Sequence, residues 1–216
     1  MEWTSLFIKM KDKKVFVLGS GEVGFRRAER FLDAGSEVIM AGTILSEKLK
    51  QKGATLKKID LKHDVDNVLN ELREVVDWSD LVVVASENHK LNEELSLMAE
   101  NKLLNRADFP QKGNVIVPTK FNVANIEISI YTHGKSPLVA KELRKRISKA
   151  INSVDILQIE LQEYVRNVLK EKKLNQKERR EMLYEVFNDD NVKNLIEEEN
   201  LEEAKRYVLS ELMNYR

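Results

Sequence analysis

The chain has no cysteine among its 216 residues. This absence excludes disulfide bonds, thiolate catalysis, and zinc or iron–sulfur centres held by cysteine. The three histidines, His63, His89 and His133, show neither an HxxxH nor an HxH spacing, so the sequence predicts no metal site. Any redox chemistry must therefore use a cofactor that the protein binds.

Long apolar runs and an excess of one charge are also missing. Charged residues interrupt every hydrophobic stretch well short of a membrane span, and the N-terminus lacks the apolar segment and cleavage site of a signal peptide. Lysine plus arginine and aspartate plus glutamate number 36 each, so the chain lacks the basic bias of a general nucleic-acid binder. We therefore expect a cytoplasmic globular protein that binds neither membranes nor nucleic acid.

The first hundred residues alternate short β-branched runs with helical patterns, which is typical of βαβ units in a parallel sheet. The last run, LVVVA, is apolar throughout, as expected for a strand that is covered on both faces. The predicted strands span residues 15–18, 37–40, 56–59 and 81–85. This region is therefore predicted to form a Rossmann-type α/β domain.

The pattern changes around Gly113. Two strand-like runs, 114–119 and 126–132, have no helix of useful length between them and predict an antiparallel excursion from the parallel sheet. A serine–proline pair at 136–137 then supplies a helix N-cap and a first helical position. From there to the C-terminus the pattern is helical, apart from Asn/Asp interruptions near 188–191.

One motif points to a ligand: a GxGxxG turn that follows the strand predicted at 15–18 and opens a helix. Its first glycine permits a tight turn, its second lets the backbone approach a pyrophosphate, and its third lets the helix press against the sheet. The helix N-terminus presents free N–H groups to phosphate. An empty glycine turn is the alternative, which the position of the motif disfavours. The predicted dinucleotide contacts are Gly19, Ser20, Gly21, Glu22, Val23 and Gly24.

The acidic residue that commonly binds the ribose hydroxyls about 20 positions further on is missing. The second strand ends Met40-Ala41-Gly42-Thr43, with neither a carboxylate nor an arginine. The charge pattern therefore leaves both NAD and NADP open. Thr43 and the nearby backbone can supply hydrogen bonds in place of the acid.

Two polar residues are expected at the same edge of the sheet. Ser86 follows the strand predicted at 81–85 and either lines the cofactor or is an ordinary loop serine. Asp108 lies in the segment NRADFP, where a carboxylate can accept a proton, although aspartate before an aromatic residue and a proline is also a common turn former. Residue types alone leave both alternatives open.

A second glycine turn, at 131–137, leads into a basic helix. Free N–H groups at the helix start, together with Lys135, can hold an anion. The helix carries further cations at Lys141, Arg144, Lys145 and Arg146. This patch suits a substrate decorated with carboxylates, and a solvated basic face is the alternative.

Taken together, the segments GSGEVG, LVVVAS, NRADFP and HGKSPLVAKELR resemble the precorrin-2 dehydrogenase family, which forms the N-terminal half of siroheme synthase. The resemblance covers nearly the whole chain. It implies oxidation of precorrin-2 to sirohydrochlorin with NAD and, as in many members, insertion of ferrous iron to give siroheme. It also implies an intertwined homodimer.

The resemblance also assigns residues. It implies dinucleotide contacts at Glu22 and Val23 and at Thr43 and Ile44, and a catalytic role for Asp108 as the proton acceptor during hydride transfer. The predicted substrate contacts are Asn105, His133, Gly134, Lys135, Ser136 and Arg144.

With the resemblance, the predicted architecture has three parts: an NAD-binding Rossmann domain over 1–112, a β-rich dimerisation segment over 113–145, and a helical domain over 146–216. The alternative function is a nucleotide-sensing Rossmann module whose helical tail contacts a partner and which has no chemistry of its own. Such a sensor usually keeps the ribose-binding acid that this chain lacks.

Overall fold

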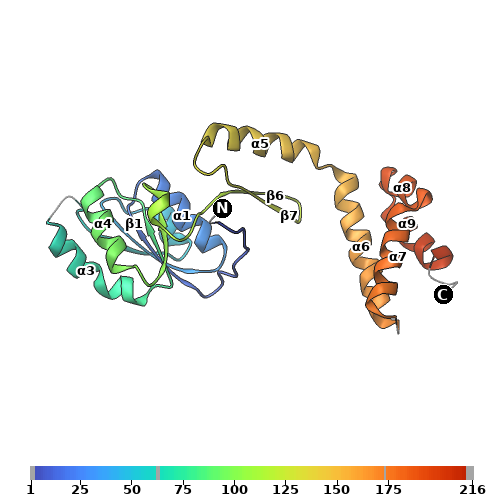
Figure 1. The fold of residues 1–216 in the computed structure, drawn as a ribbon, viewed down its shortest axis with the longest axis horizontal. Coiled ribbons are helices and arrows are strands. Elements are labelled where there is room, and N and C mark those ends of the chain that lie inside the picture. Colours follow the sequence, from blue (N-terminus) through green and yellow to red (C-terminus); the bar gives the residue numbers. More distant parts are fainter. Residues whose placement is uncertain (1–2, 62–63, 173, 213–216) are drawn as a thin grey trace. The chain divides into compact units, whose positions relative to one another are not determined.

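A computed structural model describes residues 3–61, 64–172 and 174–212 and divides the chain into two compact units, Met1–Val117 and Pro118–Arg216 (Figure 1). The predicted division into three parts is finer and stays a prediction. Its second boundary, between residues 145 and 146, falls inside a helix that spans Pro137–Ala150.

The first unit is built on a five-stranded parallel sheet with the order β3-β2-β1-β4-β5. Its strands are β1 (Lys14–Leu18), β2 (Glu37–Gly42), β3 (Thr55–Lys58), β4 (Leu81–Val84) and β5 (Leu103–Arg106). The connecting helices are α1 (Glu22–Asp33), α2 (Glu47–Gln51), α3 (Val65–Trp78) and α4 (His89–Met98), and a 3-10 turn, η1, covers Pro110–Lys112. The predicted Rossmann-type architecture is confirmed.

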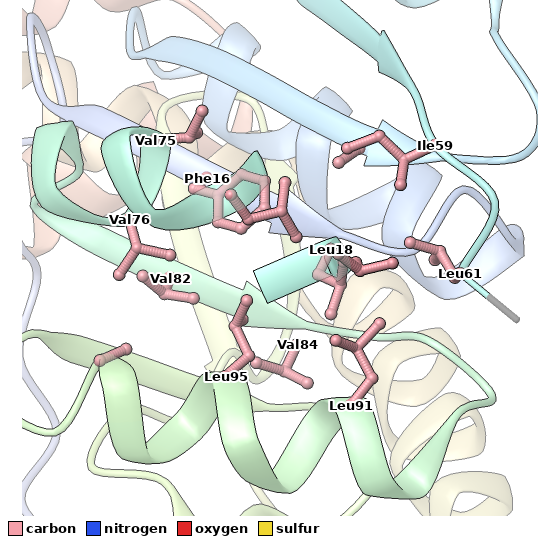
Figure 2. Packing of buried hydrophobic residues seen from close by; sticks show 14 of the residues in the cluster. Phe16, Leu18, Ile59, Leu61, Val75, Val76, Val82, Val84, Leu91 and Leu95 are labelled. Atoms are coloured by element: carbon pink, nitrogen blue, oxygen red, sulfur yellow. The ribbon is translucent and has the colours of Figure 1, made fainter. Parts of the chain in front are cut away.

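Alternate residues of β1 enter two separate hydrophobic cores, one on each face of the sheet. Phe16 and Leu18 pack with residues of α3 and α4 (Figure 2). Val15 and Val17 pack with Ala28 of α1 and its neighbours. Burial on both faces explains why β1 and β4 are nearly continuous apolar runs in the sequence.

The strand predicted at 114–119 is wrong, because residues 114–118 form no strand and β6 begins at Thr119. The backbone N–H groups of Asn114 and Val115 both donate to the carbonyl of Leu104, and the Asn114 side chain accepts from the Leu104 N–H at 2.6 Å. The segment therefore lies along β5 without forming a ladder. Val115 and Val117 pack against the core on the α1 face, so their burial explains why this apolar run resembles a strand in the sequence.

The second unit begins with an antiparallel hairpin of β6 (Thr119–Val123) and β7 (Ile126–Ile130). Five helices follow: α5 (Pro137–Ala150), α6 (Ser153–Glu171), α7 (Gln176–Asn188), α8 (Asp190–Glu197) and α9 (Leu201–Tyr207), with a π turn, η2, at Val208–Leu212. Ser136 caps α5 as predicted, since its side chain accepts from the N–H of Val139. The predicted interruption near 188–191 is confirmed at Asp189, which caps α8.

Further helix breaks went unpredicted. Asn152 and Asn175 each form a capping box with the acidic residue three positions later. An asparagine followed at that spacing by aspartate or glutamate is a signal that the sequence carries. The second unit therefore contains more, shorter helices than the sequence analysis distinguished.

Candidate functional site

An open pocket of about 910 Å³ lies at the carboxyl ends of the parallel strands. The sheet order reverses between β1 and β4, and open α/β sheets bind ligands at this switch point. The lining residues are Gly19, Ser20, Gly21, Glu22, Val23, Thr43, Ile44, Leu61, Ala85, Ser86, Glu87, Asn88, Ala107 and Asp108. The structure thus brings most of the predicted cofactor contacts together with Asp108.

The three glycines of the turn have different spatial requirements. Gly19 has φ +105°, and a Cβ there would lie 2.3 Å from the carbonyl oxygen of Ala85. A Cβ on Gly24 would lie 1.9 Å from the Gly19 carbonyl oxygen, so the fold itself needs both glycines. A Cβ on Gly21 would meet nothing within 4 Å.

The space beside Gly21 fits a pyrophosphate. Gly21 is the N-cap of α1, and no side chain caps the helix there. The N–H groups of the first turn therefore remain available to an anionic ligand, and the macrodipole of the helix favours negative charge at this end.

Ser20 holds two loops together. Its Oγ accepts from the N–H of Ile44 at 3.0 Å, and a Cβ on Gly42 would lie 2.4 Å from that Oγ. The hydroxyl of this predicted cofactor contact therefore fixes the position of the Thr43–Ile44 segment. This role depends on a tertiary contact that the glycine motif alone does not encode.

The charged groups among the described lining residues are all acidic: Glu22, Glu87 and Asp108. An additional 2′-phosphate would meet no lysine or arginine in that lining.

Ser86 is buried, and its hydroxyl is engaged with the start of α4. Its Oγ donates to Oδ1 of Asn92 and accepts from the N–H of Asn88 at 3.2 Å. Asn92, fully buried, donates through Nδ2 to the Ser86 carbonyl at 2.8 Å and to Asp108 Oδ2 at 3.0 Å. Sequence reasoning missed Asn92, although an amide on the apolar side of a helix, next to Leu91 and near Leu95, is a signal of a buried polar contact.

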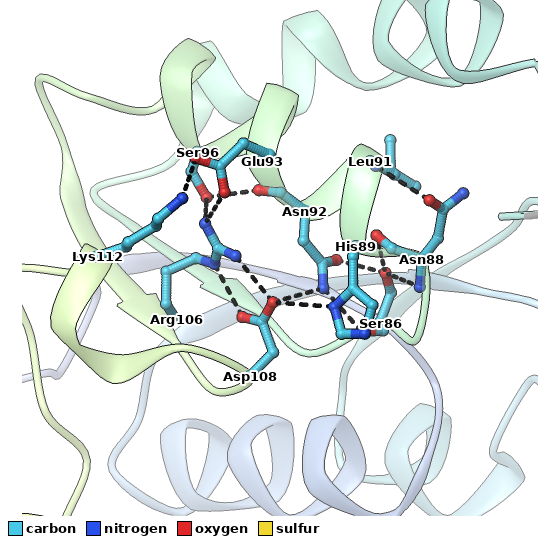
Figure 3. Close-up of polar contacts among 10 residues, drawn as sticks. All are labelled: Ser86, Asn88, His89, Leu91, Asn92, Glu93, Ser96, Arg106, Asp108 and Lys112. Atoms are coloured by element: carbon cyan, nitrogen blue, oxygen red, sulfur yellow. Dashed lines mark hydrogen bonds and ion pairs between the residues drawn. The ribbon is translucent and has the colours of Figure 1, made fainter.

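Asp108 forms a two-pronged ion pair with Arg106 (Figure 3). Arg106 Nε lies 2.8 Å from Oδ1, and Nη2 lies 2.8 Å from Oδ2. The side chain of Arg106 is 3% exposed and that of Asp108 13% exposed. Arg106 Nη1 also donates to Glu93 Oε2 and Ser96 Oγ, each at 3.1 Å. Sequence reasoning missed Arg106, although it lies two residues before Asp108 in the segment NRADFP; its contacts with Glu93 and Ser96 depend on the fold.

The pairing sets the protonation of Asp108. Burial alone raises the pKa of this carboxyl, but hydrogen bonds from Arg106 and Asn92 and the charge of Arg106 outweigh burial and lower the pKa from 3.8 to about 2. Hydrogen bonds from Lys112 and Arg106 likewise lower the pKa of Glu93. Asp108 is therefore an anion throughout the physiological pH range.

His89 is the first residue of α4, and its Nδ1 lies 3.9 Å from Asp108 Oδ2 (Figure 3). The side chain is 86% exposed. Sequence analysis gave this histidine no role, because no metal-ligand spacing includes it. His63 lies outside the described residues.

Asn105, a predicted substrate contact, is buried within β5 and is not among the residues that line this pocket. Its Nδ2 donates to the Val115 carbonyl at 2.8 Å, so it holds the segment that follows the sheet. Its Oδ1 is buried without a hydrogen-bond partner. Its contact with substrate stays a prediction.

The other predicted substrate contacts belong to the second unit. His133 and Gly134 both have positive φ, at +54° and +72°, in the exposed turn before α5. The His133 ring lies 4.7 Å from that of Tyr131, and Arg144 lies over the Phe121 ring at 5.8 Å. Lys135 is exposed, and Ser136 caps α5. Their contact with substrate stays a prediction.

Residues 3–61, 64–172 and 174–212 contain neither a metal-binding cluster nor a membrane-spanning helix. No group of three or more His, Asp or Glu side chains there is arranged to hold a metal ion. None of the helices in those ranges is long and apolar enough to cross a bilayer.

The chain is similar both to a family of nucleotide-binding domains and to individual proteins over most of their length. A family described as "Putative NAD(P)-binding" matches residues 6–119. The chain is 32% identical over 189 residues to a "Putative precorrin-2 dehydrogenase" of Methanocaldococcus jannaschii, covering 86% of this chain and 90% of the relative. It is 30% identical over 207 residues to a precorrin-2 dehydrogenase of Methanosarcina barkeri, covering 93% and 90%.

The solved structure of SirC, a precorrin-2 dehydrogenase, has the same fold. It matches with a TM-score of 0.69 and 20% sequence identity, over 95% of this chain and 100% of that chain. The arrangement of sheet, hairpin and helical region is therefore shared with that protein.

Proposed function

The chain belongs to the precorrin-2 dehydrogenase family, and from this premise we propose that it oxidises precorrin-2 to sirohydrochlorin with NAD. The observation that carries the proposal is a single pocket that joins the glycine turn to Asp108. The open space at Gly21 and the uncapped start of α1 fit the pyrophosphate of the cofactor.

The oxidation removes a hydride and a proton from the tetrapyrrole. When bound, NAD supplies the hydride acceptor. We assign the dinucleotide to the turn residues 19–24, to Thr43 and Ile44, and to the backbone around Ser86. Asp108 then provides a fixed negative charge at the same edge, where it stabilises positive charge that develops as hydride leaves.

Anaerobic mixing of the protein with precorrin-2 and NAD tests the proposal. Absorbance of reduced nicotinamide should rise together with the sirohydrochlorin spectrum, one equivalent of each. NAD binding without any turnover of precorrin-2 would instead support the alternative, a nucleotide-sensing module with a partner-binding helical tail. A variant that cannot bind the dinucleotide, Gly21→Val, is the negative control.

We also propose a second activity, insertion of ferrous iron into sirohydrochlorin. Its support is the resemblance of nearly the whole chain to the N-terminal half of siroheme synthase, together with an ionised carboxylate, Asp108, that can assist loss of protons from pyrrole nitrogens. Iron enters here as a substrate. Sirohydrochlorin and ferrous iron, mixed anaerobically with and without the protein, should show catalysed formation of siroheme; equal rates in both would exclude this activity.

A homodimer that works in the cytoplasm completes the proposal. It is supported by the family resemblance. Analytical ultracentrifugation should give twice the mass of one chain, and a single-chain mass would contradict it.

A further inference from the structure

Three hydrogen bonds already engage the carboxylate of Asp108. Oδ1 accepts from Arg106 Nε, and Oδ2 accepts from Arg106 Nη2 and Asn92 Nδ2, at distances of 2.8 to 3.0 Å. A carboxylate offers about four lone-pair positions, and a hydrogen bond from the backbone of Asp108 itself adds to these three, so little capacity is left for a further donor. Neither an arginine nor an amide gives up its proton near neutral pH. Asp108 is therefore a permanent anion and a weak proton acceptor, because a general base works best when its pKa lies near the working pH.

Arg106 cannot easily turn away from Asp108. Its guanidinium also donates to Glu93 and Ser96, and Glu93 in turn accepts from Lys112 Nζ at 2.6 Å. These contacts hold the guanidinium group from the side opposite Asp108 (Figure 3). The side chain of Arg106 is buried, whereas those of its partner Glu93 and of Lys112 are partly exposed to solvent.

His89 is an exposed side chain beside Oδ2 of the Asp108 carboxylate. Its Nδ1 lies 3.9 Å from Asp108 Oδ2, an ion-pair distance when the ring is protonated. The other ring nitrogen is then free for a ligand or water. Asp108, which is paired with Arg106, approaches His89 from the end of β5. Along the chain, Glu87 and Lys90 lie beside His89, and Glu93 lies one helical turn further on.

We propose that His89 accepts the proton in the oxidation, that Asp108 stabilises the resulting imidazolium, and that Arg106 is a positioning residue that keeps Asp108 ionised. This inference rests on the proposed dehydrogenase function. One C–H bond of the tetrapyrrole breaks, and its electron pair leaves as hydride to the nicotinamide. A second hydrogen leaves as a proton to His89 Nε2, and its electron pair stays in the new double bond of the macrocycle. Exposed His89 then passes the proton to water.

The first test replaces His89 by an amide that cannot accept the proton. His89→Gln should lower the single-turnover rate with precorrin-2 and saturating NAD by roughly 10²–10⁴-fold while NAD affinity stays unchanged. The matched control is Lys90→Gln, an exposed neighbour on the same helix, which should keep the rate of the unaltered protein. A His89→Gln protein that turns over as fast as that control overturns the proposal.

Chemical rescue separates a base from a structural residue. Because His89 is exposed, added imidazole should reach the site in His89→Ala and restore part of the rate, with the restored rate rising as the free-base form of imidazole increases with pH. Arg106→Lys keeps a positive charge but cannot hold both oxygens, so its slower turnover should not respond to imidazole. Absence of rescue in a folded His89→Ala protein, or rescue of Arg106→Lys, contradicts the assignment.

The unaltered protein distinguishes the two levels of the proposal. If it forms no reduced nicotinamide from precorrin-2, the dehydrogenase function itself fails. If it does, and His89→Gln is equally fast, only the role of His89 fails.

Discussion

At the scale of the residue, the contacts of Asp108 determine which chemistry it can perform. The carboxyl is 13% exposed, and burial by itself favours its neutral form. The two-pronged contact with Arg106 reverses that preference. The family resemblance implies a proton-accepting aspartate, which stays a prediction, whereas the geometry supports a fixed anion with the exposed His89 beside it.

The first prediction concerns acid stability. The folded-state pKa of Asp108, about 2, lies below the reference value of 3.8, so its contribution to stability is fully present above about pH 4 and is lost as pH falls towards 2. The loss should be on the order of 1–2 kcal/mol, because a side chain that keeps some contact with water realises only part of the shift. Urea unfolding at a series of pH values measures it, and Asp108→Asn should lack this component of the acid loss.

The second prediction is that Asp108→Asn lowers both turnover and stability. The amide has no negative charge with which to stabilise protonated His89, so the chemical rate should fall by roughly 10²–10³-fold, with NAD binding retained. Arg106 keeps only Glu93 as a carboxylate partner, so unfolding should become easier by about 1–3 kcal/mol, less than for a buried charge left wholly unpaired.

Single-turnover rates and melting curves measure the two effects of Asp108→Asn. The matched control is Asp33→Asn, which removes an exposed carboxylate paired with Lys52 and should change stability by less than about 0.5 kcal/mol. A folded Asp108→Asn protein with the turnover of this control would remove Asp108 from the mechanism.

At the scale of the element, the sequence identifies local patterns and misses contacts between distant segments. Strand β4 could be predicted because both of its faces are buried and all of its residues are apolar. The glycine turn could be predicted because its residues are close together in the sequence. The contacts of Arg106 with Glu93 and Ser96, and of Glu93 with Lys112, could not be predicted from spacing, since they require the folded arrangement of β5, α4 and η1. The strand wrongly predicted at 114–119 has the same origin: a short β-branched run shows that residues are buried but not that they pair with another strand.

The third prediction is that substitution of two glycines of the same turn has different effects, on NAD binding for Gly21 and on stability for Gly24. Gly21→Val should fold normally, since its Cβ meets open space, but should abolish measurable NAD binding because the side chain fills the approach of the pyrophosphate. Gly24→Val should instead destabilise the fold by about 1–3 kcal/mol or more, because its Cβ would overlap the Gly19 carbonyl. Calorimetric NAD titration and thermal unfolding of both variants check this. Unchanged NAD affinity in folded Gly21→Val would refute the phosphate site.

At the scale of the whole molecule, acidic and basic residues are equal in number but unevenly distributed along the chain. The formal net charge is zero, yet the described lining of the first-unit pocket has acidic residues as its charged groups, while α5 in the second unit carries a basic run. Lys145 of that run pairs with Glu142, and Arg144 lies over Phe121. A substrate with several carboxylates is therefore expected to draw its cationic contacts from α5, and the dinucleotide to rely mainly on backbone N–H groups.

The fourth prediction follows from this division: precorrin-2 affinity should fall with ionic strength more steeply than NAD affinity. The screening length shortens from about 30 Å at 0.01 M salt to about 8 Å at 0.15 M, which weakens exposed ion pairs most. Loss of two or three pairs, each worth about 0.3–0.7 kcal/mol, should weaken precorrin-2 binding roughly threefold to thirtyfold. Lys141→Gln should reduce the salt dependence, whereas Lys177→Gln, an exposed lysine of α7 near Glu181, should not. Binding titrations with both ligands across this salt range provide the measurement. Equal salt dependence in Lys141→Gln and Lys177→Gln would place the substrate carboxylates away from Lys141.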